Sequence, residues 1–272
     1  MIEGLRVAAV VVARDEEKHI KKTVQGLLDQ TVDLDIVLVD DGSTDKTAEI
    51  ARAMGITMLS LPFHRDSYVG TPAIAIRFNI GLGYVRRFNP DFVLIMGGDH
   101  WIPPDYVESV IDQMGGVGSE IVVASGSIEG QPAVSPRGSG RIVSVPFWEG
   151  INRMNYPLSQ GWETWLVVKA RMAGYQTRHF DYPVSKSRET RKGVHKMRGR
   201  GRGMYALGYY PYHALFRGIL LMTKRPRSGL AMIQGYFFDR GGVHKLDTFD
   251  FLRAQQKARL VTRIIEKLRG GA

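Results

Sequence analysis

The sequence predicts an α/β fold with a mainly parallel, helix-covered sheet, and three observations support this prediction. The chain of 272 residues is 44% hydrophobic and 24% charged, which is the composition of an ordinary globular protein. In residues 1–125, short apolar runs alternate with segments whose apolar residues recur at helical spacing. The connections between them are short, as in the strand–helix–strand units of a parallel sheet. A chain of this length can bury a full core, as one large domain or two small ones.

Short runs of mostly apolar residues predict five buried strands. These strands span Val7–Ala13, Ile36–Val39, Ile56–Leu61, Phe92–Met96 and Ile121–Ser125. Helices are predicted where apolar residues recur every three or four positions between turn and capping residues. They span Glu16–Leu28, Thr47–Met54, Ala73–Phe88, Tyr106–Met114, Gly161–Gly174 and Phe249–Leu268. Residues 126–141 are rich in Gly, Ser and Pro and predict a mobile loop.

The basic excess of the chain lies in its last third. The formal net charge is +10, but residues 186–272 alone hold 20 Lys or Arg against 5 Asp or Glu, and both earlier thirds are net acidic. Such asymmetry indicates a polyanionic partner, which is a phospholipid surface, a nucleic acid or a phosphorylated substrate. The alternative is a solvated basic tail that only keeps the protein soluble.

The chain contains no cysteine, which excludes disulfides, thiolate metal sites and a cysteine nucleophile. This composition fits a reducing compartment, so we expect a cytoplasmic protein. The apolar run near the start, Val7–Ala13, is too short to span a membrane and lacks a signal-peptide cleavage pattern.

Acidic residues follow several of the predicted strands directly. They are Asp15, Glu16, Asp40, Asp41 and Asp99. The carboxyl ends of parallel strands share one edge of a sheet, where ligands collect. A carboxylate there can accept hydrogen bonds from a ribose or a base, and another can hold Mg²⁺ together with substrate phosphates. The pattern favours a nucleotide–metal site, although any single Asp could be an ordinary turn or capping residue.

Four motifs resemble the inverting glycosyltransferase family 2, whose catalytic domain has the GT-A fold. They are Val11–Glu17, the Asp-Asp-Gly-Ser-Thr-Asp run of residues 40–45, Asn79-Ile80-Gly81, and Phe92–Asp99. Two positions depart from the family: Asp15 replaces an Asn, and Gly97 replaces the first Asp of an Asp-x-Asp motif. The resemblance covers residues 5–180 and continues more loosely to about residue 260.

The resemblance implies a metal-dependent, inverting enzyme with a nucleotide-diphosphate sugar as donor. UDP is the default nucleotide and GDP the alternative. It implies that Asp99 holds Mn²⁺ or Mg²⁺ and that other residues bind the nucleotide. These are Ala13, Asp15, Glu16, Asp40, Asp41, Arg77, Gly98, Asp99 and His195, with His179 as the rival of His195. It also implies a catalytic domain over residues 1–185, with a nucleotide-sugar half to about residue 100, and a basic helical extension over residues 186–272.

The same resemblance assigns the catalytic base to Glu163. In the family a helix begins Glu-Asp, and the Gly of a Gly-Tyr pair lies eleven positions after that Asp. Here Gly174 of Gly174-Tyr175 lies eleven positions after Glu163 of Trp162-Glu163. In an inverting transfer the base deprotonates the acceptor hydroxyl opposite the leaving nucleotide. The alternative is a first-turn Glu that only complements the helix dipole. No Gln-x-x-Arg-Trp motif occurs, so one sugar per encounter is expected.

A basic segment and an apolar, aromatic segment adjoin each other in residues 186–222. The combination is typical of a helix at a membrane surface, and also of single-stranded nucleic-acid binding. We expect peripheral contact with an anionic membrane at the inner face, a lipid-linked or membrane-near acceptor, and no nucleic acid. The uncharged part, residues 203–216, is shorter than the ~20 residues of a transmembrane helix. A core helix is the alternative.

Two other functions remain open at the level of sequence. A sugar nucleotidyltransferase would need a Gly-rich basic loop after the first strand, where Ala13-Arg14-Asp15-Glu16 is acidic instead. A non-catalytic membrane- or nucleic-acid-binding protein on a degenerate scaffold would account for Gly97 and the basic last third. Glu163 in register argues against it.

Overall fold

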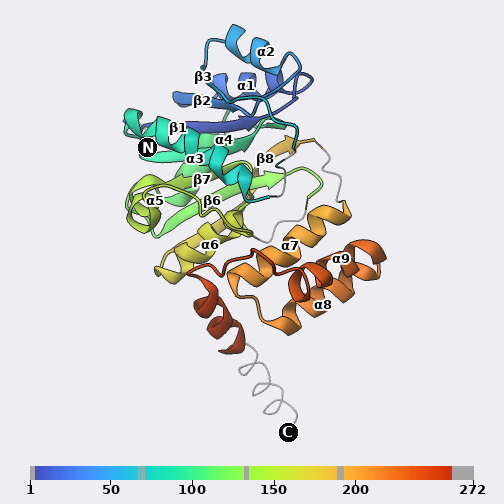
Figure 1. Ribbon diagram of the computed structural model, residues 1–272. Coiled ribbons are helices and arrows are strands. Elements are labelled where there is room, and N and C mark those ends of the chain that lie inside the picture. Colours follow the sequence, from blue (N-terminus) through green and yellow to red (C-terminus); the bar gives the residue numbers. More distant parts are fainter. Residues whose placement is uncertain (1–3, 67, 69–70, 132–134, 189–192, 259–272) are drawn as a thin grey trace. The chain divides into compact units, whose positions relative to one another are not determined.

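The computed structural model describes residues 4–66, 68, 71–131, 135–188 and 193–258 (Figure 1). The chain forms two compact units. The first consists of Met1–Ser67, Ile74–Tyr156 and Ala173–Glu189, and the second of Tyr68–Ala73, Pro157–Met172 and Thr190–Ala272. The domain boundary that the sequence places near residue 186 stays a prediction.

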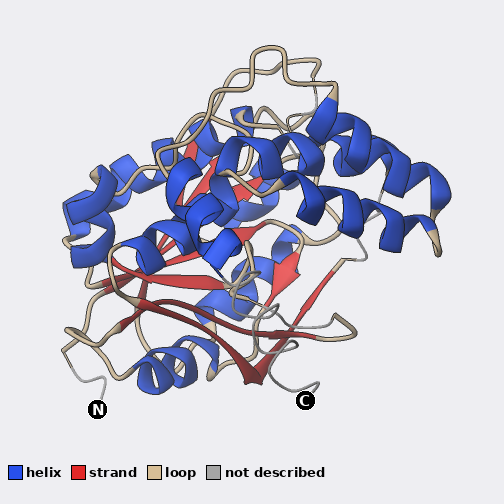
Figure 2. Cartoon of the chain, turned by 90° about the horizontal axis from the view of Figure 1, so that it is seen from below, coloured by secondary structure: helices blue, strands red, loops and turns tan. Residues whose placement is uncertain are grey.

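The first unit is built on an eight-stranded sheet with the order β3-β2-β1-β4-β7-β6-β8-β5. Its strands run side by side in Figure 2, drawn in red. They span β1 Val7–Ala13, β2 Leu34–Asp40, β3 Thr57–Ser60, β4 Phe92–Gly97, β5 His100–Trp101, β6 Ile121–Ile128, β7 Arg141–Ser144 and β8 Gln176–Ser187. The strands β1 to β4 pair in parallel, whereas β7 pairs antiparallel with both β4 and β6. The predicted mainly parallel α/β sheet is therefore confirmed.

Three strands were not predicted, each for a physical reason. β5 has only two residues, and β7 follows directly on a Gly- and Ser-rich stretch. β8 is half-exposed along most of its length, so it lacks the continuous apolar run that identifies a buried strand. The mobile-loop prediction for residues 126–141 was wrong at residues 126–128, which belong to β6, and at Arg141, which begins β7. Residues 132–134 lie outside the described part.

The helices of the first unit are α1 Ile20–Leu28, α2 Thr47–Ala53, α3 Ala73–Val85, α4 Tyr106–Met114 and α5 Val145–Asn152. All but α5 were predicted, with two errors at the ends. α1 begins four residues later than expected, because residues 16–19 form a turn in which the Glu16 carbonyl accepts from the amides of His19 and Ile20. The last turn of the third predicted helix is a separate 3₁₀ helix, Arg86–Phe88.

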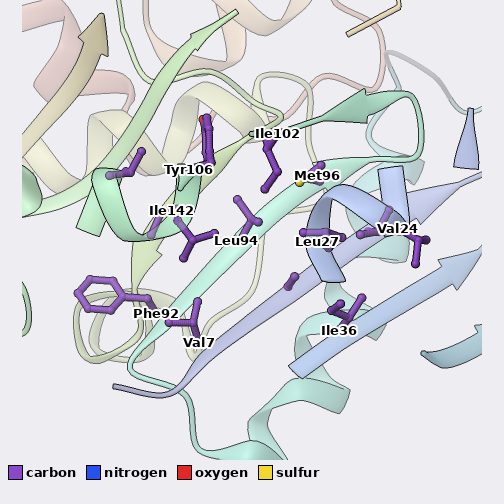
Figure 3. Close-up of a cluster of buried hydrophobic side chains, with 14 of the residues drawn as sticks. Val7, Val24, Leu27, Ile36, Phe92, Leu94, Met96, Ile102, Tyr106 and Ile142 are labelled. Carbon is purple, nitrogen blue, oxygen red and sulfur yellow. The ribbon is translucent and has the colours of Figure 1, made fainter. Parts of the chain in front are cut away.

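The core of this unit lies between one face of the sheet and two helices (Figure 3). Val7 of β1 and Leu94 of β4 lie on that face, and Leu27 of α1 and Tyr106 of α4 pack over it. Every residue of β1 is buried, so this strand is covered on both faces. A central parallel strand therefore reads as a continuous apolar run, which is why the sequence located it correctly.

The second unit is helical. Its elements are α6 Trp162–Met172, α7 Val194–Leu207, α8 Pro211–Met222 and α9 Pro226–Phe237, and residues 249–258 are also helical. The rest of the last predicted helix, residues 259–268, lies outside the described part. A small core holds Met197 and Met204 of α7, Ala214 of α8, and Met232 and Tyr236 of α9.

The Arg-Gly repeat of residues 198–203 lies inside α7 and serves helix packing. A Cβ atom on Gly201 would lie 2.1 Å from the Met232 carbonyl of α9, and one on Gly203 would lie 3.1 Å from the Gly161 amide. The glycines thus let α7 approach its neighbours closely. Arg198 contacts Asp239 at 2.8 Å, so its charge is engaged within the unit.

The apolar stretch 204–222 is divided between two helices. α7 ends at Leu207, Gly208 adopts a φ of 93°, and α8 begins at Pro211. No helix in the described residues is long and apolar enough to cross a membrane.

Candidate functional site

The predicted site residues of the first unit lie along one edge of the sheet. β1 pairs with β2 on one side and with β4 on the other, and Ala13 stands opposite Asp40. The carboxyl ends of the three strands therefore bring together residues 13–16, 40–41 and 98–99, as expected for parallel strands.

Ala13 and Gly98 form the tightest point of this edge. The Gly98 amide donates to the Val12 carbonyl at 2.9 Å, and the Asp41 amide donates to the Ala13 carbonyl at 2.9 Å. A Cβ atom on Gly98 would lie 2.6 Å from the Cβ of Ala13. Only small side chains fit here, so the floor of the site is backbone.

The loop of residues 40–45 is locked onto the loop after β1 by reciprocal hydrogen bonds. The Asp15 carboxylate accepts from the Thr44 amide at 2.8 Å, and the Asp15 amide donates to the Ser43 hydroxyl at 3.0 Å. Asp45 accepts from the Glu17 amide at 3.0 Å. Burial raises the pKa of Asp45, but the hydrogen bonds from Thr47 and from the Glu17 amide outweigh it and hold that pKa below its usual value. Asp15 therefore positions the loop of residues 40–45. Its own backbone adopts a positive φ of 51°.

Asp41 is buried and carries two basic partners. Its Oδ1 accepts from Arg77 Nε at 2.6 Å and lies 3.0 Å from His64 Nε2. Arg14 in turn donates to the backbone carbonyls of His64 and Asp66. The Arg77 guanidinium thus neutralises a buried carboxylate at the site. The neighbouring Asp40, also buried, accepts from the Ser43 hydroxyl.

A three-residue ion cluster lies at the end of β4. Nη2 of Arg188 is 2.9 Å from Glu16 Oε1 and 3.2 Å from Asp99 Oδ2, and the Arg188 amide donates to the Asp99 carbonyl at 3.0 Å. Burial, and then the charge of Asp99, raises the pKa of Glu16 to about 7, while Arg188 opposes both effects. We refer to Glu16, Asp99 and Arg188 as the carboxylate–arginine cluster.

The carboxylate–arginine cluster is also the candidate binding site for the divalent metal ion that the family resemblance implies. Gly97 supplies no carboxylate, and the described residues contain no group of three or more acidic, His or Cys side chains that could hold an ion. However, oxygens of Glu16 and Asp99 already converge on one cationic atom of Arg188. Mg²⁺ takes one or two protein carboxylates and completes its shell with substrate phosphates and water. The pair therefore fits a divalent cation that binds together with a nucleotide.

The other predicted residues belong to the second unit. Glu163 is exposed in the first turn of α6, and its charge partly offsets the desolvation that lowers the pKa of Arg200 on α7. His195 is exposed in the first turn of α7. Its rival His179, in the first unit, lies 3.1 Å from the Ser127 hydroxyl, and burial lowers its pKa. The assigned roles of Glu163 and His195 stay predictions.

Sequence reasoning missed four residues of this edge: Arg14, His64, Ser139 and Arg188. The Ser139 hydroxyl accepts from the Gly97 amide at 3.0 Å and lies 2.6 Å from Nδ1 of the buried His100. Arg188 comes directly after β8 and is one of many basic residues in its segment. Nothing in the local pattern distinguishes any of the four, since their roles arise from contacts across long sequence separations.

The comparisons with known proteins agree with this geometry. The model of the family "Glycosyl transferase family 2" matches residues 8–167. Among curated proteins, a 4,4'-diaponeurosporenoate glycosyltransferase of Staphylococcus aureus is 38% identical over 52 residues, which is 19% of this chain and 14% of that protein. The chain thus spans only a small part of that relative's length.

Solved structures resemble the chain over much more of its length. S. aureus TarS in complex with UDP is 14% identical, with a TM-score of 0.52 over 88% of this chain and 92% of that one. The mannosyltransferase PcManGT from Pyrobaculum calidifontis, in complex with GDP-Man and Mn²⁺, is 16% identical, with a TM-score of 0.57 over 87% and 86%. Glucosyl-3-phosphoglycerate synthase from Mycobacterium tuberculosis, with Mn²⁺, UDP and phosphoglyceric acid, is 17% identical, with a TM-score of 0.52 over 70% and 73%. These likenesses confirm the GT-A fold.

Proposed function

Because the chain belongs to glycosyl transferase family 2, we propose that it transfers one sugar per encounter from a nucleotide-diphosphate sugar to an acceptor hydroxyl or phosphate. The observation that carries the proposal is the edge where β1, β2 and β4 end. There a backbone floor at Ala13 and Gly98 adjoins the buried Asp40 and Asp41 and the carboxylate–arginine cluster. An edge with these groups offers acceptors for a nucleoside and charge for a diphosphate.

Asp40 and Asp41 would bind the nucleoside end of the donor. Both carboxylates are already oriented, Asp40 by Ser43 and Asp41 by Arg77. We take UDP as the default nucleotide and GDP as the alternative, since TarS is seen with UDP and PcManGT with GDP-Man.

Asp99 and Glu16 would hold Mn²⁺ or Mg²⁺ when the donor binds. The ion would neutralise the charge that develops on the leaving diphosphate. Arg188 would then pair with the phosphates of the donor, because the bound cation would neutralise its two carboxylate partners. The Arg188 guanidinium, which neutralises the carboxylates before the donor binds, would thus bind the diphosphate of the donor afterwards.

Glu163 would act as the general base of an inverting transfer. Its carboxylate takes the proton of the acceptor hydroxyl as that oxygen attacks the anomeric carbon, on the face opposite the leaving nucleotide. Its place in the first turn of α6 suits a carboxylate, because the N-terminal end of a helix favours negative charge.

Glu163→Gln tests this assignment. The amide keeps the shape of the side chain but cannot take a proton, and general-base catalysis contributes about 10²–10⁴-fold. We expect donor nucleotide binding like that of the wild type, measured by calorimetry, and turnover lower by that factor, measured by nucleotide release from a panel of donors. The exposed Glu108→Gln on α4 is the matched control. A Glu163→Gln variant with normal turnover would assign the base to another carboxylate.

We also propose that the enzyme works peripherally at the inner, cytoplasmic face of a membrane, on a lipid-linked or membrane-near acceptor. The charge of the last third supports this proposal, because 20 basic residues against 5 acidic ones suit an anionic leaflet.

A further inference from the structure

Helix α8 has two apolar faces, and within the described part of the chain only one of them is packed. Ala214 and Gly218 are buried. A Cβ atom on Gly218 would lie 2.3 Å from Cγ1 of Ile233 on α9, and one on Gly229 would lie 2.4 Å from the Gly218 carbonyl. The two helices therefore pack closely along this face. Figure 1 shows α8 and α9 side by side.

The opposite face of α8 exposes four large apolar side chains. Leu215 is 44% exposed, Phe216 65%, Ile219 52% and Leu220 59%. Leu215 and Ile219, like Phe216 and Leu220, are four positions apart and therefore neighbours on the helix surface, so the two pairs form a stripe along α8. We call these four residues the α8 face. A contiguous apolar surface of this kind marks an interaction site.

Basic residues adjoin the α8 face. Arg217 lies beside the stripe, and Lys224, Arg225 and Arg227 follow at the turn into α9; all four are exposed. A shallow hollow at that turn is lined by Arg225, Pro226, Arg227 and Ser228. Residues 190–238 contain ten Lys or Arg and no Asp or Glu, so no acidic residue of this segment offsets the positive charge.

We propose that the α8 face inserts into an anionic phospholipid bilayer, with Arg217, Lys224, Arg225 and Arg227 on the lipid phosphates. An exposed apolar stripe bordered by cations is complementary to that surface, because the apolar side chains enter the lipid while the cations contact the phosphates. Contact of the stripe with water or with a purely polar partner would be unfavourable. α8 has 12 residues and is about 18 Å long, so it lies in the plane of the interface. This inference rests on the proposed membrane association and names the surface that makes it.

The structure favours a bilayer over a single-stranded nucleic acid. Nucleic-acid grooves use exposed aromatic rings on which bases stack. The α8 face has three aliphatic residues and one aromatic. The nearby tyrosines make contacts within the protein. The rings of Tyr210 and Tyr212 pack with 5.2 Å between their centroids, and the Tyr236 hydroxyl donates to the Tyr209 carbonyl. The Arg-Gly repeat of residues 198–203 is packed within α7.

Site-specific labelling tests the docking surface directly. The chain has no cysteine, so Phe216→Cys and Leu220→Cys each provide a single thiol for an environment-sensitive fluorophore. Adding vesicles of 70% phosphatidylcholine and 30% phosphatidylglycerol should shift both labels to the blue. Leu158→Cys, 61% exposed in the same unit but outside α8, is the matched control and should not shift.

Vesicle flotation measures the strength of docking. Phe216→Glu/Leu220→Glu should weaken binding about 100-fold, which is tenfold for each large apolar side chain withdrawn from lipid. Leu158→Glu should bind like the wild type. Replacing Arg217, Lys224, Arg225 and Arg227 by Gln should remove the dependence on anionic lipid and on salt. Circular dichroism and a thermal shift with UDP and Mn²⁺ show whether each variant is folded and still binds nucleotide.

Three outcomes would overturn the inference. The first is a folded Phe216→Glu/Leu220→Glu variant that floats like the wild type. The second is that the wild type sediments as a dimer, the variant sediments as a monomer, and neither binds vesicles. The α8 face would then be an interface between two copies of the chain. The third is tight salt-dependent binding to oligo(U) without binding to vesicles. Normal docking without any nucleotide shift would instead refute the proposed function and leave the docking surface intact.

Discussion

At the scale of single residues, the proposed binding of a metal ion and of the donor depends on the carboxylate–arginine cluster. The family resemblance predicts that Asp99 is a metal ligand, and it shows that Gly97 replaces the first Asp of the Asp-x-Asp motif. A Cβ atom at Gly97 would lie only 3.1 Å from Asp99 Oδ1, so any side chain there would crowd that carboxylate. In the proposed metal site Glu16 would supply the second oxygen donor instead, and Arg188 contacts both carboxylates.

Arg188→Gln should make the cluster a better site for a metal alone and a worse one for a nucleotide. Without the guanidinium, Glu16 and Asp99 face each other unneutralised, so we expect about tenfold tighter binding of Mn²⁺, the effect of one charge-assisted bond. Binding of UDP with Mn²⁺ should weaken by a similar factor. Electron paramagnetic resonance of free Mn²⁺ measures the first effect, and calorimetry the second. Arg178→Gln, exposed on the same strand, is the control, and an unchanged Mn²⁺ affinity in Arg188→Gln would contradict the prediction.

Glu16 should make stability depend on pH between about 4.5 and 7. Its pKa rises from 4.5 in the unfolded chain to about 7 in the folded protein, so the folded state binds more protons in this range. Its contribution to stability is therefore fully present below pH 4.5 and is lost as the pH rises to about 7. We expect the melting temperature of Glu16→Gln relative to the wild type to increase across this range. The exposed Glu49→Gln should give a flat difference; a flat difference for Glu16→Gln would mean that its pKa is not raised.

At the scale of elements, glycine placement explains the helices that the sequence described least well. The alternation of Arg and Gly in residues 198–203 is unfavourable for a helix, because glycine has a low helix propensity. Tertiary packing overrides that preference, since only glycine lets α7 contact the backbones of α9 and of Gly161. The strands β5, β7 and β8 were missed because β5 has two residues, β7 follows a Gly- and Ser-rich stretch, and β8 is largely exposed, so none shows the local pattern of a buried strand.

Gly201→Ala should destabilise the second unit by about 1–3 kcal/mol, the usual cost of overpacking. The added Cβ would meet the Met232 carbonyl at 2.1 Å, and backbone can yield only if α7 and α9 separate. Gly83→Ala on α3 is the matched control, because a Cβ there meets nothing within 4 Å. Removing a glycine from a helix should stabilise that variant by up to ~1 kcal/mol. Urea denaturation followed by circular dichroism measures both; a Gly201→Ala variant as stable as the wild type would contradict the close packing.

At the scale of the whole molecule, the two compact units carry different chemistry. The first holds the acidic edge of the sheet and the second holds the basic helices, which accounts for the opposite net charges of the early and late parts of the chain. The proposed function assigns donor binding to the first unit, and the base and the lipid contact to the second.

Nucleotide with metal should therefore stabilise the molecule, and chelation should reverse the effect. At 100 times its Kd, a ligand adds about 2.7 kcal/mol to the free energy of unfolding, which raises the melting temperature by roughly 5–10 °C. We expect this shift with UDP or GDP plus Mn²⁺, and its loss with EDTA or in Asp99→Ala. Asp35→Asn, exposed at the opposite end of β2, is the control. A shift of equal size in Asp99→Ala with EDTA would remove Asp99 from the metal site.

The sequence by itself determined the buried parallel strands, the helices that cover them and the edge at which Ala13, Asp40, Asp41 and Asp99 meet. Local pattern is enough for these features, because a strand buried on both faces must be continuously apolar and parallel strands must end at one edge. Only the tertiary structure decided the partners of those residues. Arg188 reaches Glu16 across 172 positions, and one apolar face of α8 is exposed among the residues that the structure describes. Both result from how the chain folds back on itself, and no local pattern encodes which distant groups then lie within a few ångströms.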